Sequence, residues 1–445
     1  MGVWREVTLA DIAKTDGYGM VDGPFGSNLP AADYTETGVP VIRGVNLSTG
    51  DVRFKDDAFI FVSERTAERL RRSLCVAEDI IFTKKGTLGQ VGYIPRSHKY
   101  EKFLISSNQL KLSVNKQIAD PLFVYYSVSS PSSRAKIVQD SESTGVPKIN
   151  LSYLRQFPIL LPSIDQQRAV ARILSSLDDK IELNRRMNAT LEAMARALFK
   201  AWFVDFEPVH ANQEKRTSTS ASPEIAALFP SDFKNGLPQG FQAMRLGEVL
   251  ELIESGSRPK GGIDPNLKDG IPSLGAESVN GLGVYDYSKT KFVTRDFFES
   301  MRRGQLRDYD VLIYKDGAYV GRKGMFGRGF PFRESAVNEH VFILRSNEKA
   351  SQFYLYFELN PEKLAQLNAN SAQPGLNQSA MKSFELSLPP HPVLSAFDES
   401  VKPLIDKVFE NCKEIRTLSE LRDSLLPPLI SGRIRVGGGL ESYAS

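Results

Sequence analysis

Cysteine, histidine and long apolar runs are all scarce in this sequence of 445 residues. The two cysteines, Cys75 and Cys412, lie far apart and belong to no cluster with ligand spacing. This excludes a disulfide framework and a zinc ribbon, and it fits a reducing compartment. No apolar run approaches the ~18–20 residues that a membrane-spanning helix needs. The stretch 1–14 also lacks the basic-then-apolar order of a signal peptide, so we expect a cytoplasmic protein without membrane contact.

Sequence signatures of catalysis are missing as well. The chain contains no Gly-Lys pair, which excludes a phosphate-binding loop of the Gly-x-x-x-x-Gly-Lys-Ser/Thr type. It also lacks the Asn-Pro-Pro-aromatic tetrapeptide of amino-methyltransferases. The four histidines (His98, His210, His340 and His391) are isolated, so no metal-ligand spacing and no His-based nucleophile stands out. We expect a chain that is not itself an enzyme and that holds no metal and no cofactor.

An internal repeat runs along the whole chain. Residues 150–199 match residues 377–426 without a gap, with Asn150 falling on Asn377 among many identical pairs. A period near 230 residues is far longer than the ~20–50 residues of a solenoid repeat. The sequence therefore predicts a duplicated unit, in each copy of which a variable domain precedes a better-matched segment.

Weaker similarities extend the repeat upstream in the same order. Residues 38–44 resemble residues 270–276, and residues 78–86 resemble residues 309–317. The dipeptide Asn108-Gln109 similarly resembles Asn338-Glu339. Any one of these matches could arise by chance between turn-rich stretches, but their common order indicates duplication.

The matched segments predict two long helices. Apolar residues recur at alternating steps of four and three, which is the period of a coiled coil. A helix over 165–202 would be ~55 Å long, which overhangs its own domain and favours the other copy as its partner. Two amphipathic helices packed on their own domains remain the alternative. Asn184 and Asn411, at the same position in both copies, are typical register-fixing residues. The predicted seam consists of Leu174, Leu177, Ile181, Asn184, Leu191, Leu198, Leu404, Val408, Asn411, Ile415, Leu418 and Leu425.

Prolines and turn residues set the expected boundaries. Pro403 should kink the second helix or mark its true start, and Pro427-Pro428 should end it. The variable parts read as α+β, with short β-like runs at 39–43, 80–83, 109–114, 311–314 and 341–344. The stretch 215–223 has a linker composition, although the apolar residues 225–229 suggest partial docking. The Gly437–Gly439 run predicts a flexible end rather than a nucleotide-binding loop.

Charge becomes informative only locally. Fifty-six basic against 53 acidic residues give a net charge of +3, so a nucleic-acid surface would have to be confined to a patch. Residues 84–148 hold ten basic and four acidic residues, and the related stretch 315–333 holds five and one. Both stretches mix Lys and Arg with Gly and aromatic residues, which favours contact with DNA phosphates and bases. The candidate contacts are Arg43, Lys84, Lys85, Arg96, Lys148, Arg258, Lys260, Lys315, Arg322, Lys323 and Arg328.

Three stretches carry a family resemblance. They are residues 160–170 (LLPSIDQQRAV), residues 201–209 (AWFVDFEPV) continuing into 223–230, and residues 421–432 (LRDSLLPPLISG). With the duplicated layout, they make the chain similar to the specificity subunit of type I restriction–modification systems. Residues 391–398 depart from that pattern, because they replace the usual Gln-Gln-Arg opening of the second helix.

The resemblance implies a fold and a role. The fold is two tandem target-recognition domains joined by two long helices in an antiparallel coiled coil, with pseudo-twofold symmetry. Each domain would read one half of a bipartite double-stranded DNA target, and the helices would bind two methyltransferase subunits and the restriction subunits. The expected boundaries are 1–160 for recognition domain 1, 161–206 for helix 1, 207–239 for a linker, 240–389 for recognition domain 2, 390–432 for helix 2 and 433–445 for a tail.

Two other functions compete with this one. An enzyme in its own right would need a carboxylate or histidine cluster, which the sequence does not supply. A coiled-coil scaffold without nucleic acid would account for the helices and would leave the duplicated, locally basic domains without a role.

Overall fold

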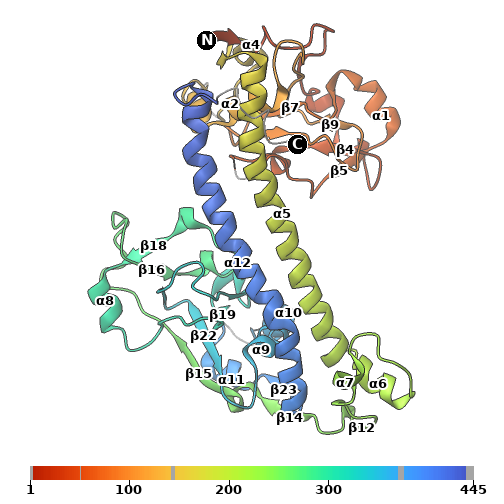
Figure 1. The fold of residues 1–445 in the computed structure, drawn as a ribbon, viewed down its shortest axis with the longest axis vertical. Helices are drawn as coiled ribbons and strands as arrows, with labels where there is room; N and C mark the ends of the chain where they lie inside the picture. The colour runs from red at the N-terminus through yellow and green to blue at the C-terminus, as the bar shows by residue number, and fades with distance from the viewer. Residues whose placement is uncertain (1–3, 51, 142–145, 369–374, 437–445) are drawn as a thin grey trace, which may run out of the picture. The chain divides into compact units, whose positions relative to one another are not determined.

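The computed structural model describes residues 4–50, 52–141, 146–368 and 375–436, and the Gly437–Gly439 run lies outside them. The chain divides into two compact units. Unit 1 contains the residues up to Glu182 and those from Thr417 onward, whereas unit 2 is Leu183–Arg416. The long helices α5 (Ile164–Phe203) and α12 (His391–Ile430) each contribute to both units (Figure 1).

Unit 1 is built on an antiparallel four-stranded sheet, a mixed five-stranded sheet and short helices. A four-stranded sheet has the order β2-β10-β7-β8, a five-stranded sheet has the order β3-β5-β4-β9-β6, and β1 pairs with β11. The strands are β1 (Arg5–Thr8), β2 (Met20–Asp22), β3 (Tyr34–Thr35), β4 (Val39–Ile42), β5 (Ile60–Val62), β6 (Leu74–Cys75), β7 (Ile80–Thr83), β8 (Val91–Tyr93), β9 (Phe103–Ile105), β10 (Gln109–Leu112) and β11 (Pro158–Leu161). The helices are α1 (Glu64–Arg69), α2 (Pro121–Ser129), α3 (Pro131–Gln139) and α4 (Leu151–Gln156).

Unit 2 repeats this plan. Its five-stranded sheet has the order β15-β22-β19-β20-β17, its three-stranded sheet has the order β18-β16-β21, and β14 pairs with β23. The strands are β12 (Phe233–Lys234), β13 (Leu237–Pro238), β14 (Gln242–Arg245), β15 (Leu250–Ser255), β16 (Ile271–Leu274), β17 (Gly281–Leu282), β18 (Lys291–Val293), β19 (Val311–Tyr314), β20 (Lys323–Met325), β21 (Ala336–Val337), β22 (Val341–Ser346) and β23 (Glu385–Leu388). The helices are α6 (Glu207–Gln213), α7 (Pro223–Ala226), α8 (Arg295–Ser300), α9 (Gln352–Glu358), α10 (Pro361–Asn368) and α11 (Gln378–Lys382).

The predicted duplication is visible in local details of the backbone. Asn150 and Asn377 are both N-cap residues, whose side chains accept the backbone N–H three residues later. Gly38 and Gly270 both have positive φ, and a Cβ at either would lie within 2.4 Å of a carbonyl oxygen on the neighbouring strand. The two asparagines and the two glycines match in the repeat because each copy needs the same helix cap and the same close contact between strands.

One upstream match is wrong. Gln109 lies opposite Thr83 in unit 1, whereas Val341 lies opposite the related Tyr314 in unit 2. The backbone agrees, because Lys84 donates to the Asn108 carbonyl and Lys315 donates to the His340 carbonyl. Asn108 therefore corresponds to His340 and not to Asn338, and Gln109 corresponds to Val341 and not to Glu339.

The expected helices and β-like runs are largely confirmed. The first helix begins and ends within one residue of the predicted 165–202, and the runs at 80–83 and 311–314 match β7 and β19. The strands β4, β10 and β22 overlap the other three runs. Periodicity and turn residues thus locate these elements correctly.

The two long helices run antiparallel within each unit. In unit 1, Val170, Leu174 and Leu429 share one buried cluster, which joins the start of α5 to the end of α12. In unit 2, the rings of Trp202 and Phe397 lie 6.0 Å apart and join the end of α5 to the start of α12. Each β-domain packs on its own stretch of this helix pair.

One of the two alternatives predicted for Pro403, that it marks the start of the second helix, is wrong. The second helix is continuous from His391 to Ile430, so Pro403 lies in its interior and does not mark its start. A mid-helix proline costs about 3 kcal/mol. Val401 and Ile405, fully buried on either side of it, each contribute about 1.5–3 kcal/mol and offset that cost. Pro427 and Pro428 lie within the last turn of the helix, which ends two residues beyond them.

The stretch 215–223, predicted from its composition to be a linker, is held in place by hydrogen bonds to one carboxylate. The carboxylate of Glu207 accepts hydrogen bonds from Ser220 Oγ at 2.7 Å and from the Thr219 N–H at 3.0 Å, and it pairs with Arg216 at 2.8 Å. Burial would raise the pKa of Glu207, but these hydrogen bonds hold it well below its usual range. The stretch is therefore folded around one carboxylate. Phe229 is buried in the core of unit 2, as the apolar run 225–229 suggested.

Among the described residues, no helix combines the length and the apolar character that crossing a bilayer would require.

Candidate nucleic-acid interface

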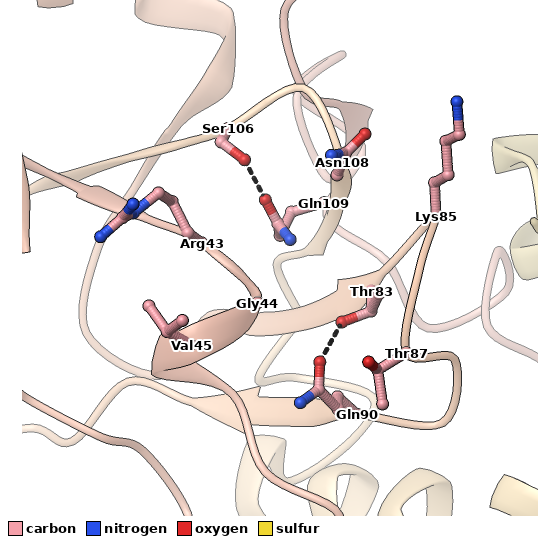
Figure 2. Close-up of a pocket in the computed structure, with 10 residues that line it drawn as sticks. All are labelled: Arg43, Gly44, Val45, Thr83, Lys85, Thr87, Gln90, Ser106, Asn108 and Gln109. Atoms are coloured by element: carbon pink, nitrogen blue, oxygen red, sulfur yellow. Dashed lines mark hydrogen bonds between the residues drawn. The ribbon is translucent and has the colours of Figure 1, made fainter. Parts of the chain in front are cut away.

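Three loops of unit 1 enclose a polar cavity of about 390 Å³ (Figure 2). The loops follow β4, connect β7 to β8 and connect β9 to β10, and they contribute residues 43–45, residues between 83 and 90, and residues between 106 and 109. The β7–β8 loop turns through Gly86 and Gly89, which both have positive φ. The sheets thus bring loops from separate parts of the sequence to one concave surface.

Amide side chains give this cavity its chemical character. Thr83 Oγ1 donates to Gln90 Oε1 at 3.1 Å, and Ser106 Oγ donates to Gln109 Oε1. Asn108 is exposed at the same surface. Side-chain amides offer a donor and an acceptor side by side, which is the pattern that adenine presents in the major groove. The cavity can therefore read base edges, and Val45, 54% exposed, adds an apolar contact suited to a thymine methyl.

The predicted basic residues near the cavity differ in their exposure and in the groups that they contact. Arg43 lines it and donates to the Ala58 carbonyl at 2.7 Å, while its buried Nε has no hydrogen-bond partner. Lys85 is exposed at the rim with its ammonium directed outward, and its backbone pairs with that of exposed Lys148 (Figure 2). Lys84 instead forms an ion pair with Asp22 at 2.7 Å. Lys85 is the candidate whose position best suits a phosphate contact.

At least five of the ten basic residues in 84–148 form ion pairs with carboxylates. Glu78 pairs with both Arg96 and Lys116, which places the predicted Arg96 outside the cavity lining. Lys102 pairs with Glu64 at 2.7 Å. The acidic partners come mostly from before residue 84, so a count within the window overstates the charge of the surface.

Unit 2 carries different side chains on the same frame. Arg322, which corresponds to Gln90, stacks on Tyr319 with 3.7 Å between the guanidinium carbon and the ring centroid. His340, which corresponds to Asn108, has its Nδ1 2.7 Å from Asp316 Oδ2. Arg258 pairs with Glu339 at 2.9 Å. A guanidinium and an imidazole thus replace two amides of unit 1.

The other predicted basic residues of unit 2 divide into outer and inner positions. Lys260 is exposed, and Lys315 lies over the ring of Phe342 at 5.0 Å. Arg328 pairs with Asp406 at 3.4 Å and with Glu410 at 3.2 Å, both on α12. Arg328 therefore attaches the β-domain of unit 2 to the helix and is withdrawn as a DNA contact.

Lys323 is withdrawn for a clearer reason. It is only 8% exposed, donates to the Tyr356 carbonyl and lies 4.4 Å from the centroid of the Tyr356 ring. Burial lowers the pKa of Lys323 to about 7. A side chain held inside the domain does not reach a phosphate.

Sequence reasoning missed Gln90, Thr83 and Ser106, because uncharged polar residues do not stand out in a count of charges. Their signal was nevertheless present. The segment Lys84–Gly89 lies within the predicted basic stretch 84–148, and Gln90 directly follows it before a buried strand. Reading that loop to its end would have included Gln90.

The twelve predicted seam residues are all buried or half-buried on α5 and α12. Near the middle of the helices, Asn184 donates to Glu414 at 2.8 Å and Asn411 donates to Asn188 at 2.9 Å. Asn184 and Asn411 are at most 1% exposed, and the side-chain oxygen of each has no hydrogen-bond partner. These side chains form a buried polar layer between the two helices of unit 2.

Neither metal ligation nor cysteine chemistry shapes the described surface. Within the part of the chain that the structure describes, no group of three or more His, Cys, Asp or Glu residues could hold a metal ion. Cys75 and Cys412 are both buried and free, and burial raises the pKa of both thiols. The amide, hydroxyl and basic side chains at this surface can form hydrogen bonds and ion pairs.

The chain is similar in sequence to proteins of one known family. The sequence model of the type I restriction modification DNA specificity domain matches residues 3–193 and 238–397, which is well over half of the chain. A curated relative from Methanocaldococcus jannaschii, the type I restriction enzyme MjaIX specificity subunit, is 25% identical over 440 residues, covering 96% of this chain and 94% of the relative. The HindI specificity subunit of Haemophilus influenzae is 23% identical over 396 residues, covering 78% and 84%.

A solved structure supports the fold independently. The S subunit of a type I restriction–modification system from M. genitalium superposes with a TM-score of 0.60 at 15% identity, covering 96% of each chain. Two matched copies of the domain, the duplicated β-frame and the paired long helices agree. The chain belongs to the family of type I restriction–modification DNA specificity subunits.

Proposed function

We propose that this chain reads a bipartite DNA target, with the β-domain of each unit recognising one half-site. The observation that carries this proposal is a repeated frame with unlike side chains. The same loops follow the same strands in both units, yet the positions of Gln90 and Asn108 are occupied by Arg322 and His340 in unit 2. Two domains with the same backbone arrangement can each bind one part of the same duplex. Their different side chains suit half-sites of different sequence.

The helix pair serves as the scaffold in this proposal. Leu183 and Met194 of α5 are 53% and 52% exposed, and Leu421 of α12 is 44% exposed. Large apolar side chains on the outer faces of helices suit a protein partner better than solvent. We place two methyltransferase subunits, and with them the restriction subunits, on these helices. Adenine methylation and DNA cleavage would belong to those partners, and the complex would work in the cytoplasm, where the bacterial or archaeal chromosome lies.

The test is a methylation map of a host that expresses this chain together with its methyltransferase subunit. Single-molecule sequencing should show methylated adenines in a motif of two unequal parts separated by a fixed gap. The chain expressed alone should leave no methylation. A continuous motif, or no motif, would contradict the proposal.

A matched biochemical experiment separates the competing functions. The purified chain would be incubated with duplex DNA and Mg²⁺, and then with the methyl donor. We expect neither cleavage nor methylation, and activity of the chain alone would favour an enzyme. DNA binding by the assembled complex should weaken steeply with salt, whereas absent binding would favour a scaffold without nucleic acid.

A further inference from the structure

Gln90 and Arg322 occupy one backbone position in the two units. Thr83 donates its N–H to the Gln90 carbonyl at 3.1 Å, and Tyr314 donates its N–H to the Arg322 carbonyl at 2.8 Å. Each residue immediately precedes a buried strand, β8 or β20, that pairs antiparallel with β7 or β19. The equivalence follows from hydrogen bonds and does not depend on sequence similarity.

Both side chains are held in place before any ligand arrives. The amide of Gln90 lines the cavity and is oriented by the hydroxyl of Thr83 at 3.1 Å (Figure 2). The guanidinium of Arg322 lies flat on Tyr319, itself 53% exposed, and donates to Asn280 Oδ1 at 3.2 Å. Holding a side chain in its binding geometry lowers the entropy lost on binding.

The two functional groups match different bases. An amide pairs with adenine through one donor and one acceptor, directed at N7 and N6. A guanidinium pairs with guanine through two donors, directed at N7 and O6. The guanidinium is planar in itself, and the ring of Tyr319 beside it restricts the direction in which its two parallel donors point. A contact with phosphate alone would not need that restriction.

We propose that this position reads a base in both units, with Gln90 selecting adenine in one half-site and Arg322 selecting guanine in the other. The proposal rests on the proposed function, since it names the base that each domain would read. The residue before this position is a glycine with positive φ in both units, Gly89 and Gly321, and a Cβ on either would face α3 or α10 of its own domain.

The experiment compares the wild-type chain with Gln90→Arg and Arg322→Gln, each co-expressed with the methyltransferase subunit, by methylation mapping. Gln90→Arg should convert one A·T requirement of one half-site into G·C, and Arg322→Gln should do the reverse in the other half-site. Duplexes with the original base should lose on the order of ten- to a hundredfold in affinity. The unaltered half-site and the gap should stay as they are.

Two further variants separate base reading from charge. Arg322→Lys keeps the charge and loses the fork, so it should relax the guanine requirement without changing the slope of affinity against salt. Arg328→Gln removes the same charge from an arginine that faces α12, so the motif should stay unchanged.

The outcomes are distinct. A wild-type motif that survives Arg322→Gln, with affinity lowered equally for all sequences and the salt slope reduced by about 1, would identify a phosphate contact and overturn the inference. A wild-type map without a bipartite motif would instead overturn the proposed function. Melting temperatures of all variants confirm that they are folded, and the conservative Gln90→Glu, which should favour cytosine, replaces Gln90→Arg if the arginine does not fit.

Discussion

Arg422 of α12 donates to Asp178 of α5 at 2.9 Å, and the two side chains are only 9% and 11% exposed. The second carboxylate oxygen of Asp178 accepts the hydroxyl of Tyr126, on α2, at 2.6 Å. One carboxylate thus connects both long helices to the β-domain within unit 1. Burial by itself would lower the pKa of Arg422, but the charges and hydrogen bonds of Asp178 and Asp423 together raise it, so the guanidinium remains charged.

Asp178→Asn should therefore destabilise unit 1 strongly. The substitution keeps the shape of the side chain but leaves a buried guanidinium with only the exposed Asp423 as its partner. Losing one member of a buried ion pair costs about 3–5 kcal/mol. Urea unfolding measures this, with Glu68→Gln as the control, because the exposed pair of Glu68 with Arg71 contributes only about 0–1 kcal/mol. Equal effects of the two substitutions would show that Asp178 is not a structural connection.

Lys323 should make the stability of unit 2 depend on pH. Burial lowers its pKa from 10.5 to about 7, with the positive charge of Arg196 adding to the effect and Glu192 and Glu358 opposing it. Between pH 7 and 10.5 the unfolded chain binds more protons than the folded chain, so stability rises with pH across this window. Below pH 7 the destabilisation is complete.

Lys323→Met should remove this dependence. At 1.36 kcal/mol per pKa unit, the variant should gain on the order of several kcal/mol over the wild type near neutral pH, and the gain should shrink as the pH approaches 10. Denaturant unfolding at several pH values measures it. Parallel curves for the two proteins would contradict the buried, weakly basic lysine. The methylation motif should not change, because the side chain does not reach the surface.

Features that follow from a periodic pattern could be predicted from the sequence, whereas features that depend on tertiary contacts could not. The extent of α5 was predictable because apolar spacing reports which face of a helix is buried. Pro403 misled because its local cost is offset by the burial of Val401 and Ile405, which the sequence near the proline does not reveal. The charge of 84–148 misled because Asp22, Glu64 and Glu78 neutralise it from outside the window. The sequence did not distinguish Lys323 from its basic neighbours, because its burial comes from α9, which is distant in the sequence.

Lys85→Gln should weaken DNA binding without changing the motif. The exposed ammonium at the rim of the cavity suits a phosphate, and each phosphate contact contributes about 0.9 to the slope of log affinity against log salt. The slope of the assembled complex should fall by about 1. Lys102→Gln is the control, since that ammonium pairs with Glu64. An altered motif in Lys85→Gln would make this residue a base contact.

Matched insertions in the helices should lengthen the gap between the half-sites. Seven residues after Glu182 of α5 and seven before Thr417 of α12, at the boundary between the two units, would keep the heptad phase of both helices. The buried contacts of Asn184 and Asn411 would then be retained. Seven helical residues add ~10 Å, which corresponds to about three base pairs at ~3.4 Å each. The methylation map should show both half-sites unchanged and a gap about three base pairs longer. Insertion into α5 alone should abolish methylation, because it mismatches the seam. A functional double insertion with the original gap would show that the helices do not set the spacing.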